Sequence, residues 1–320
     1  SYQVFVVHKD NDKGAGYLRE CGASVFCTRI SFGLSASAVV EEDLLNPVEF
    51  LNFLKNFVKI PIGMFLTWQY IRKLKPSLLY LNEFVLPHCS LVGKLMNVPT
   101  IMHVRGPILR GRWGLRRRLL QEMLLRWNDR IIAITRADAE QLLEASRNNE
   151  GMGIVHNVYE FTDRSDNGGK IDPLDENVFH PRKGSRIVSM LGGVSRIKGT
   201  LDFVQAAEHL SAILPDVVFI VAGPYNRNFR FGPIKGESRG QKKYNRSVLQ
   251  FVQQHNLWER VLFLGEIRNI GELLQRTDLL VFPSTISHFA RPVIESWSFK
   301  KPVIMTDTPH ARELDENDLY

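Results

Sequence analysis

Short apolar runs alternate with stretches of helical periodicity along most of this chain. Such alternation is typical of βα units, in which helices cover a parallel sheet. In the first half, the runs predict strands at Gln3–Val7, Ser24–Cys27, Leu78–Leu81, Thr100–Val104, Arg130–Ile134 and Met152–Val155. In the second half, they predict strands at Arg186–Leu191, Val217–Ala222, Val261–Leu264, Asp278–Phe282 and Pro302–Thr306. Between the strands we expect helices at Val48–Lys73, Leu115–Trp127, Ala137–Ser146 (with Thr135 as N-cap), Thr200–Leu214, Arg246–His255, Ile270–Arg276 and Arg291–Phe299.

A polar stretch, 162–185, separates the two halves. It is rich in glycine, proline and aspartate and has no periodicity, as expected for a linker or a long surface loop. At 320 residues the chain is long enough for two cores. We therefore predict an α/β protein of two Rossmann-like parallel-sheet domains, 1–170 and 171–320, that face each other across a cleft.

The net charge of +7 and the pI near 9.3 favour polyanionic partners, such as nucleotides, phosphorylated lipids or an anionic membrane surface. Only the net charge favours nucleic acid, so no nucleic acid is expected as a partner. The three cysteines form no C-x-x-C pair, which predicts a reducing, cytoplasmic environment and no structural metal.

Two stretches are candidates for contact with a membrane. Lys55, Lys59 and Pro61 interrupt the apolar stretch 50–68, so we expect no membrane-spanning helix there. The stretch 105–126 interleaves arginines with apolar residues, as in helices that lie on anionic lipid or cover a protein core. We expect a cytoplasmic protein that is either in solution or peripheral on the inner membrane face.

Two strand–helix junctions in the second half carry residues that suit a phosphate. At the first, Gly192 and Gly193 allow a sharp turn, and Arg196 and Lys198 place two cations beside a helix start. The alternative for this junction is a glycine turn with solvated basic residues.

At the second junction, a strand ends at Phe282 and a helix begins near Arg291. The free N–H groups and the dipole at a helix start favour an anion. Glu295, about one turn further, can reach the hydroxyls of a sugar. Because the carboxyl ends of parallel strands share one edge of a sheet, we expect both junctions to open on the same edge.

The motifs between 186 and 307 follow one another in a familiar order. A glycine turn with Lys198-Gly199 is followed by VVFIVAG, by VLFLG, by a strand that closes in Pro-Ser, and by FARPVIE and KPVI. In this order and spacing, the second half resembles glycosyltransferase family 4, the group 1 retaining glycosyltransferases of the GT-B fold. The first half resembles the acceptor domain of that family more weakly, at NVPTIMHVRGP and DRIIAITRADA.

The resemblance implies a retaining transfer of a sugar from an NDP-sugar to a hydroxyl of a sugar or lipid-linked glycan, in polysaccharide or glycolipid synthesis. It implies no cofactor and no metal. Lys198, with Arg196, would hold the donor diphosphate, and Glu295 would hold the ribose. The remaining donor contacts would come from Gly192, Gly193, Ser287, His288, Phe289, Ala290 and Arg291.

The chain departs from the family pattern at three positions. Ser287 stands where the first carboxylate of the family's E-x7-E pair is usual. Gly193 stands where an arginine is usual, and Arg196 is its expected substitute. Arg105 stands at the position of the acceptor-domain histidine, with His103 two residues earlier on the same face of the strand.

The acceptor side is predicted at the ends of two strands of the first half. Arg105 and Gly106 end one strand, and Asn82 and Glu83 end another. His103 is a further candidate, although a lone histidine at a strand end is as often structural as functional.

Two other classes of function stay open. Ser287, together with the absence of the family's first strand and glycine loop from the sequence, favours a catalytically silent GT-B module, such as a partner subunit or a membrane-attached scaffold. The same comparison predicts that the sequence is a piece of a longer family protein. A dinucleotide oxidoreductase is disfavoured, because Gly14-Ala15-Gly16 lacks the third glycine of the fingerprint and Arg19 stands in its place.

Overall fold

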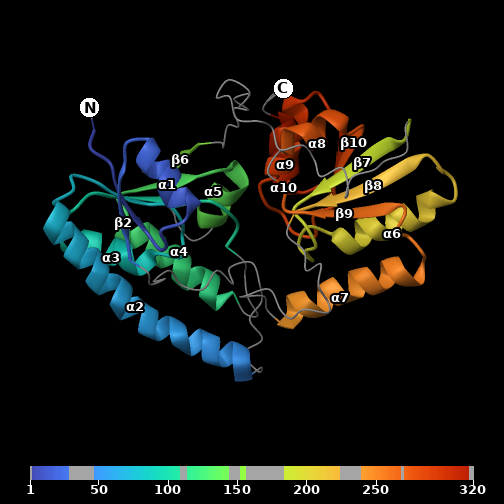
Figure 1. Cartoon of the computed structure of the whole chain (residues 1–320). Coiled ribbons are helices and arrows are strands. Elements are labelled where there is room, and N and C mark those ends of the chain that lie inside the picture. The colour runs from blue at the N-terminus through green and yellow to red at the C-terminus, as the bar shows by residue number, and fades with distance from the viewer. Residues whose placement is uncertain are drawn as a thin grey trace. The chain divides into compact units, whose positions relative to one another are not determined.

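The chain divides into two compact units, Ser1–His156 and Asn157–Tyr320, each described by itself (Figure 1). The predicted boundary between 170 and 171 lies outside the described residues. The computed structural model describes residues 2–28, 47–108, 114–143, 152–155, 184–223, 239–267 and 270–316.

The first unit contains two separate parallel sheets among its described residues, where the sequence predicted one. One sheet is β1-β2 and the other has the order β3-β4-β5-β6. The strands are β1 (Phe5–His8), β2 (Ser24–Cys27), β3 (Leu79–Leu81), β4 (Thr100–Val104), β5 (Arg130–Ala133) and β6 (Met152–Ile154). The helices are α1 (Lys13–Glu20), α2 (Pro47–Leu74), α3 (Pro87–Leu95), α4 (Leu115–Trp127) and α5 (Arg136–Leu143).

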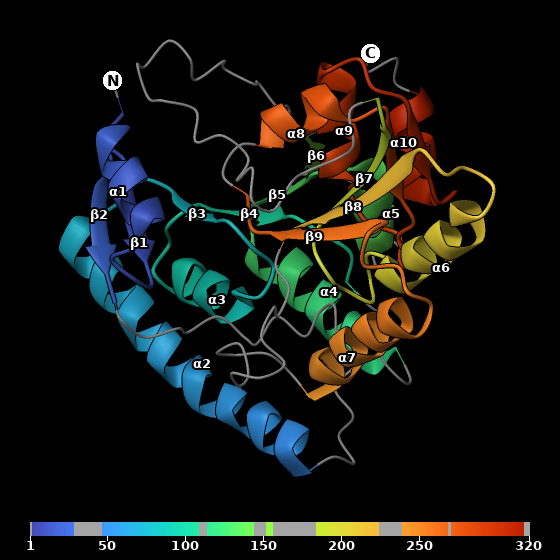
Figure 2. The ribbon, with the colours of Figure 1, turned by 45° about the vertical axis from the view of Figure 1, so that its right-hand side comes forward.

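The core of the first unit lies on one face of the larger sheet. Alternate strand residues such as Leu81, Met102 and Ile131 are buried there, together with Leu124 of α4 and Leu142 of α5. Figure 2 shows α3 and α4 below this sheet and α2 beside β1 and β2. The period of two in burial explains why these strands could be recognised from the sequence.

The second unit is built on a five-stranded parallel sheet of order β11-β10-β7-β8-β9. Each of its predicted strands is confirmed to within two residues at either end. The strands are β7 (Arg186–Leu191), β8 (Val217–Ala222), β9 (Val261–Gly265), β10 (Leu279–Phe282) and β11 (Val303–Met305). The helices are α6 (Thr200–Ser211), α7 (Arg239–Gln254), α8 (Ile270–Arg276), α9 (Arg291–Ser298) and α10 (Pro309–Glu316).

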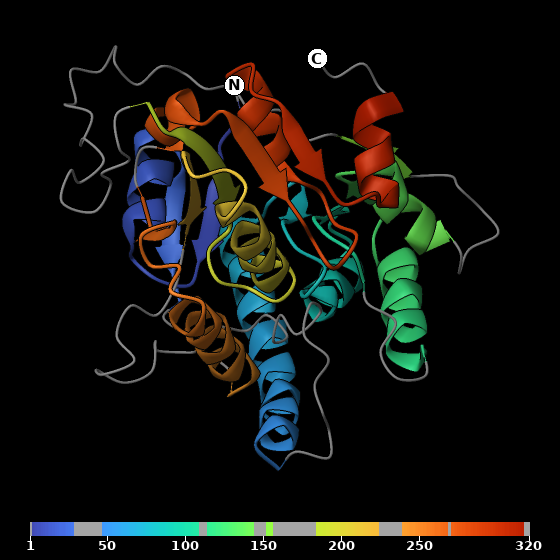
Figure 3. The same cartoon turned by 90° about the vertical axis from the view of Figure 1, so that its right-hand side faces the viewer.

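All six residues of β8 are buried, because helices cover both faces of this sheet. Phe219 and Val221 pack into the cluster that contains residues of α6 and α7. Ile220 and Ala222 pack into the cluster on the other face, with Leu273 of α8. Figure 3 shows this unit from the side, with its strands between the two layers of helices. The sheet edge that carries both predicted junctions is therefore held by a core on each side.

Several helices differ from the prediction. Helix α7 begins at Arg239, seven residues before the predicted start at Arg246. The prediction missed these first turns because their residues are almost all polar. Helices α1, α3 and α10 were not predicted. The N-cap at Thr135 is confirmed: its Oγ1 accepts from the Asp138 N–H at 3.0 Å. No helix in the described part of the chain is both long enough and apolar enough to cross a membrane.

Candidate functional site

The loop after β7 and the loop after β10 are in direct contact. The Thr285 N–H donates to the Ile197 carbonyl at 3.0 Å, and Thr285 Oγ1 donates to the Arg196 carbonyl at 3.1 Å. Ser284 Oγ lies 2.9 Å from the same Ile197 carbonyl. The predicted meeting of the two junctions at one sheet edge is thus confirmed.

Lys198 joins the two loops through its side chain. Its Nζ lies 2.7 Å from Nε2 of His288 and 5.0 Å from the centre of the Phe282 ring. The stem of Lys198 runs along Gly192, where a Cβ would lie 3.2 Å from Lys198 Cγ. Since an ammonium only donates, His288 Nε2 accepts, and the proton of the neutral ring is then on Nδ1, 3.1 Å from the Ile286 carbonyl. His288 is therefore a neutral partner of this cation.

The environment of Lys198 disfavours its charged form. Burial, with a smaller contribution from the positive charge of Arg291, lowers the pKa of Lys198 to about 8. An anionic ligand beside Nζ would reverse this effect, because an opposite charge favours the ammonium. The site is therefore suited to a negatively charged group more than to a neutral one.

The pKa of Lys198 predicts how binding of a nucleoside diphosphate sugar depends on pH. A diphosphate would bind the protonated lysine, so its affinity should be constant below pH 7 and should fall about five- to sixfold between pH 8 and pH 9. Binding at pH 8 should take up about half a proton. Calorimetry of a nucleoside diphosphate sugar in buffers of different ionisation enthalpy measures both quantities. In Lys198→Arg the profile should flatten, because arginine stays charged; a wild-type profile that is already flat would contradict the assignment.

The glycines of the first junction serve the turn rather than offering free amides. The N–H groups of Gly192 and Gly193 both donate to the Ala222 carbonyl at 2.9 Å. Gly223 closes the same turn at a φ of +127°, and a Cβ there would lie 2.4 Å from the Gly193 nitrogen. Contact of a ligand with this turn would therefore be through the Cα atom of exposed Gly192, beside the stem of Lys198.

The two helix starts beside the site differ in how they are capped. At α6, the Leu201 N–H donates to the Tyr244 hydroxyl at 2.9 Å, so a protein oxygen already occupies this terminus. At α9, the N-cap residue Ala290 provides no side-chain hydrogen bond, and Pro292 lies in the first turn. The start of α9 is thus the better place for a phosphate oxygen. Phe289 beside it is buried, which fixes the backbone of this turn.

Glu295 and Arg291 form an ion pair one turn apart on α9. Arg291 Nε lies 3.3 Å from Glu295 Oε1; the arginine side chain is exposed, whereas that of Glu295 is buried. Burial raises the pKa of Glu295, and the charge of Arg291 acts against that rise. A buried carboxylate with one partly free oxygen is suited to accept hydrogen bonds from neutral hydroxyls.

Helix α7 contributes residues that the sequence did not single out. The guanidinium of Arg196 lies over the Tyr244 ring, 5.7 Å from its centre. Gln241 Nε2 donates to the Val194 carbonyl at 2.7 Å and to Asn245 Oδ1 at 2.7 Å. These contacts hold the loop that carries Arg196 and Lys198. Tyr244 and Asn245 are buried on one face of this helix. Almost all residues of 239–246 are polar, so the sequence shows no apolar period that would indicate a helix there.

Ser287, the position of the missing carboxylate, contacts a residue from further along the chain. Its Oγ lies 2.6 Å from Nδ1 of His310, near the start of α10. His310 is fully buried. The hydroxyl of Ser287 is therefore held by a histidine that the sequence gave no reason to select.

In the first unit, the predicted acceptor residues lie along two neighbouring strands. On the same face of β3 and β4, the Tyr80 hydroxyl and His103 Nδ1 are 2.6 Å apart. Buried Nε2 of His103 has no hydrogen-bond partner among the described residues. Burial and the charge of Arg105 lower the pKa of His103. Asn82 is exposed at the end of β3, while Arg105 is exposed and Gly106 half-buried after β4.

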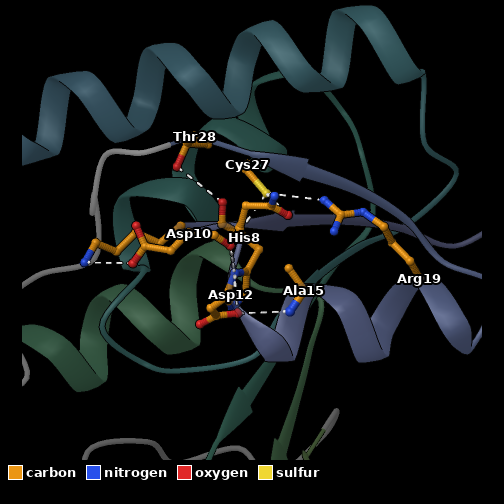
Figure 4. Close-up of polar contacts among 9 residues, drawn as sticks. His8, Asp10, Asp12, Ala15, Arg19, Cys27 and Thr28 are labelled. Carbon is orange, nitrogen blue, oxygen red and sulfur yellow. Dashed lines mark hydrogen bonds and ion pairs between the residues drawn. The ribbon is translucent and has the colours of Figure 1, made fainter.

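The glycine pair of the weak dinucleotide fingerprint lies inside a helix rather than in a loop. Gly14 and Gly16 belong to α1, whose terminus is capped by Asp12: the Ala15 N–H donates to Asp12 Oδ1 at 3.0 Å (Figure 4). A carboxylate thus occupies the place that a pyrophosphate would take. In addition, no group of three or more potential metal ligands gathers anywhere in the described part of the chain.

A family model named Glycosyl transferases group 1 matches residues 173–318, which include the whole of the site in the second unit. The second unit is thus similar to the group 1 glycosyltransferases. Several solved structures are similar to nearly the whole chain. Anabaena HepE in complex with UDP and glucose has a TM-score of 0.67 at 19% identity, covering 97% of this chain and 74% of that chain. The fold is therefore GT-B, as predicted.

Two further proteins are similar to this chain. Trehalose-6-phosphate synthase OtsA has a TM-score of 0.69 at 11% identity, covering 98% of this chain and 87% of that chain. A curated Escherichia coli protein, UDP-Gal:alpha-D-GlcNAc-diphosphoundecaprenol alpha-1,3-galactosyltransferase, is 26% identical over 136 residues. That match covers 42% of this chain and 31% of the relative, so the chain spans about a third of the curated protein's length.

Proposed function

We propose that this chain is a group 1 glycosyltransferase that moves a sugar from a UDP-sugar to a hydroxyl of a sugar or lipid-linked glycan, with retention of configuration. The choice of UDP is supported by HepE, which was solved with UDP and with UDP-glucose. The lipid-linked class of acceptor is supported by the Escherichia coli relative, whose name gives a diphosphoundecaprenol acceptor.

The observation that carries this proposal is the contact between Lys198 and His288, which unites the two phosphate-suited loops. It presents an ammonium at the edge of the sheet where α9 begins. The exposed Arg291 and Arg196 side chains add two further cations to this edge. A diphosphate, with its two charged groups, matches such an arrangement better than a neutral ligand does.

In the proposed reaction, the bond between the anomeric carbon and the diphosphate oxygen breaks, and the acceptor oxygen bonds to that carbon. The acceptor proton passes to the departing diphosphate. Lys198 and Arg196 would stabilise the charge that develops on this leaving group. His103, Arg105, Gly106 and Asn82 of the first unit are the proposed contacts of the acceptor, and Ser287 and His288 those nearest the donor sugar.

Titration of the protein with UDP, UDP-glucose and UDP-galactose tests donor binding, and release of UDP with a polyprenyl diphosphate-linked sugar tests transfer. The proposal requires binding of UDP in the micromolar to millimolar range that is usual for substrates. Equal affinity for NAD and UDP, or no binding of UDP, would contradict the proposed function.

Glu295→Gln tests the proposed ribose contact. Removing the carboxylate charge should weaken UDP binding about tenfold, since hydrogen bonds to charged groups contribute about 1.5–3 kcal/mol. Inorganic diphosphate has no ribose, so its affinity should not fall, and the loss of the Arg291 partner can even raise it. Parallel titrations with the two ligands provide the comparison. An equal loss for both ligands would place Glu295 in support of the phosphate site and not at the ribose.

A second candidate, a donor-binding module without transfer activity, is favoured by the pairing of Ser287 with His310 where the family pattern has a carboxylate. This candidate predicts that the protein binds UDP and UDP-sugars but transfers no sugar to any acceptor. The same titration and transfer assays therefore separate it from the first.

A further inference from the structure

Helix α2 has two different apolar faces, of which the unit buries one. The inner face consists of Gly63, Thr67, Tyr70, Ile71 and Leu74, spaced by three and four residues. The Tyr70 ring packs 5.7 Å from the Phe26 ring of β2. Ile71 is 6% exposed, so this face forms part of the interior.

The outer face, here called the outer stripe, consists of Val58, Pro61, Phe65, Trp68 and Arg72. These residues repeat at intervals of three and four and therefore lie along one side of the helix, opposite the inner face. The side chains of Val58, Phe65 and Trp68 are 62%, 57% and 39% exposed. Pro61 and Arg72 are exposed too. An apolar stripe of this length on a surface indicates a contact with a partner.

The aromatic residues of the stripe are ordered against one another and against a cation. The Phe65 and Trp68 ring centres are 5.8 Å apart, and the Arg72 guanidinium lies 4.9 Å from the centre of the Trp68 ring. Arg72 thus covers one end of the stripe, with exposed Lys75 just beyond it. The stripe therefore ends in positive charge.

The charge of this segment selects among possible occupants. Residues 58–75 contain Lys59, Arg72, Lys73 and Lys75 and no aspartate or glutamate. A second copy of the same stripe would bring like charges together with no acidic residue to compensate them. An anionic lipid surface supplies both the apolar boundary and the negative charge.

We propose that the outer stripe docks the first unit on an anionic lipid surface, with Phe65 and Trp68 at the headgroup boundary and Arg72 and Lys75 on lipid phosphates. Aromatic side chains and long basic side chains are the residues that such a boundary favours. The helix then lies along the surface and does not cross it. This surface belongs to the first unit and the donor site to the second, so the proposal does not depend on the proposed function.

Sedimentation with vesicles tests the proposal. The full chain should partition onto vesicles of equal parts phosphatidylcholine and phosphatidylglycerol, and weakly onto phosphatidylcholine alone. The double variant Phe65→Ser/Trp68→Ser should lose about tenfold in partitioning, and Arg72→Glu/Lys75→Glu should lose about as much, with the loss greatest at low salt. Trp258→Ser is the matched control, because Trp258 is 50% exposed on the second unit and should leave partitioning unchanged.

Three results would overturn the proposal. They are equal partitioning of the wild type onto both kinds of vesicle, unchanged partitioning of the Phe65→Ser/Trp68→Ser variant, and a change of oligomeric state in that variant. Thermal unfolding of each variant confirms that it is folded. Titration with UDP should give the wild-type affinity in all of them, so failure of lipid docking and failure of donor binding are distinguishable.

Discussion

Lys198→Ala is expected to weaken binding of UDP-glucose by about 10- to 100-fold, because a charge-assisted contact to a phosphate is worth about 1.5–3 kcal/mol. The lysine side chain contacts both loops of the site, through His288 and along Gly192. Calorimetry at pH 7, where this ammonium is protonated, measures the loss.

The same variant separates a role in binding from a role in the fold. Burial disfavours the charge of Lys198, so its removal should not lower the melting temperature. By linkage, the unfolded chain binds this proton more tightly, so the wild type should gain stability from about pH 8 upwards, and Lys198→Ala should lack that gain. Lys300→Ala is the matched control, an exposed lysine at the other end of α9. Equal affinities of the two variants for UDP-glucose would contradict the assignment.

Gly199→Ala is expected to destabilise the second unit by about 3 kcal/mol, lowering its melting temperature by about 10 °C. Gly199 ends the first junction at a φ of +71°, and a Cβ there would lie 1.8 Å from the Pro283 carbonyl oxygen. The backbone must therefore separate the two loops, which would also displace Lys198 from His288. Thermal unfolding and UDP-glucose titration of this variant should both be affected.

Gly184→Ala is the matched control for that variant. Gly184 has a φ of +91° in the same unit, but no atom of the described residues lies within 4 Å of a Cβ at its position. It therefore carries the cost of a left-handed backbone alone, about 1–2 kcal/mol. If the two variants unfolded at the same temperature, the close approach of the two loops would not matter for stability.

The parts of the site that lie in order along the chain could be predicted from the sequence. The strands β7 and β10 were visible as apolar runs, and the residues after each of them are suited to a phosphate. The expected meeting of Lys198 with the loop before α9 followed from a general property of parallel sheets. The start of α9 at Arg291 was also predicted, with Glu295 about one turn into the helix.

The contacts that depend on distant parts of the chain could not be predicted. His310 reaches Ser287 from α10, which was not predicted as a helix. Tyr244 supports Arg196 from a helix whose first turns are too polar to show an apolar period. In each case tertiary packing, and not local propensity, selects the partner.

The pairing of β1 with β2 in a sheet of their own is a similar case. The apolar runs predicted both strands, but strand order is not encoded in alternation. Phe26 packs on Tyr70 of α2, so the helix and not a third strand supports this pair among the described residues.

The most direct test of the central claim is a crystal structure of the protein with UDP bound. The account predicts the β-phosphate within hydrogen-bond distance of Lys198 Nζ and of the amides at the start of α9, with the ribose hydroxyls on Glu295. A diphosphate bound away from both junctions, with Lys198 still on His288, would contradict it.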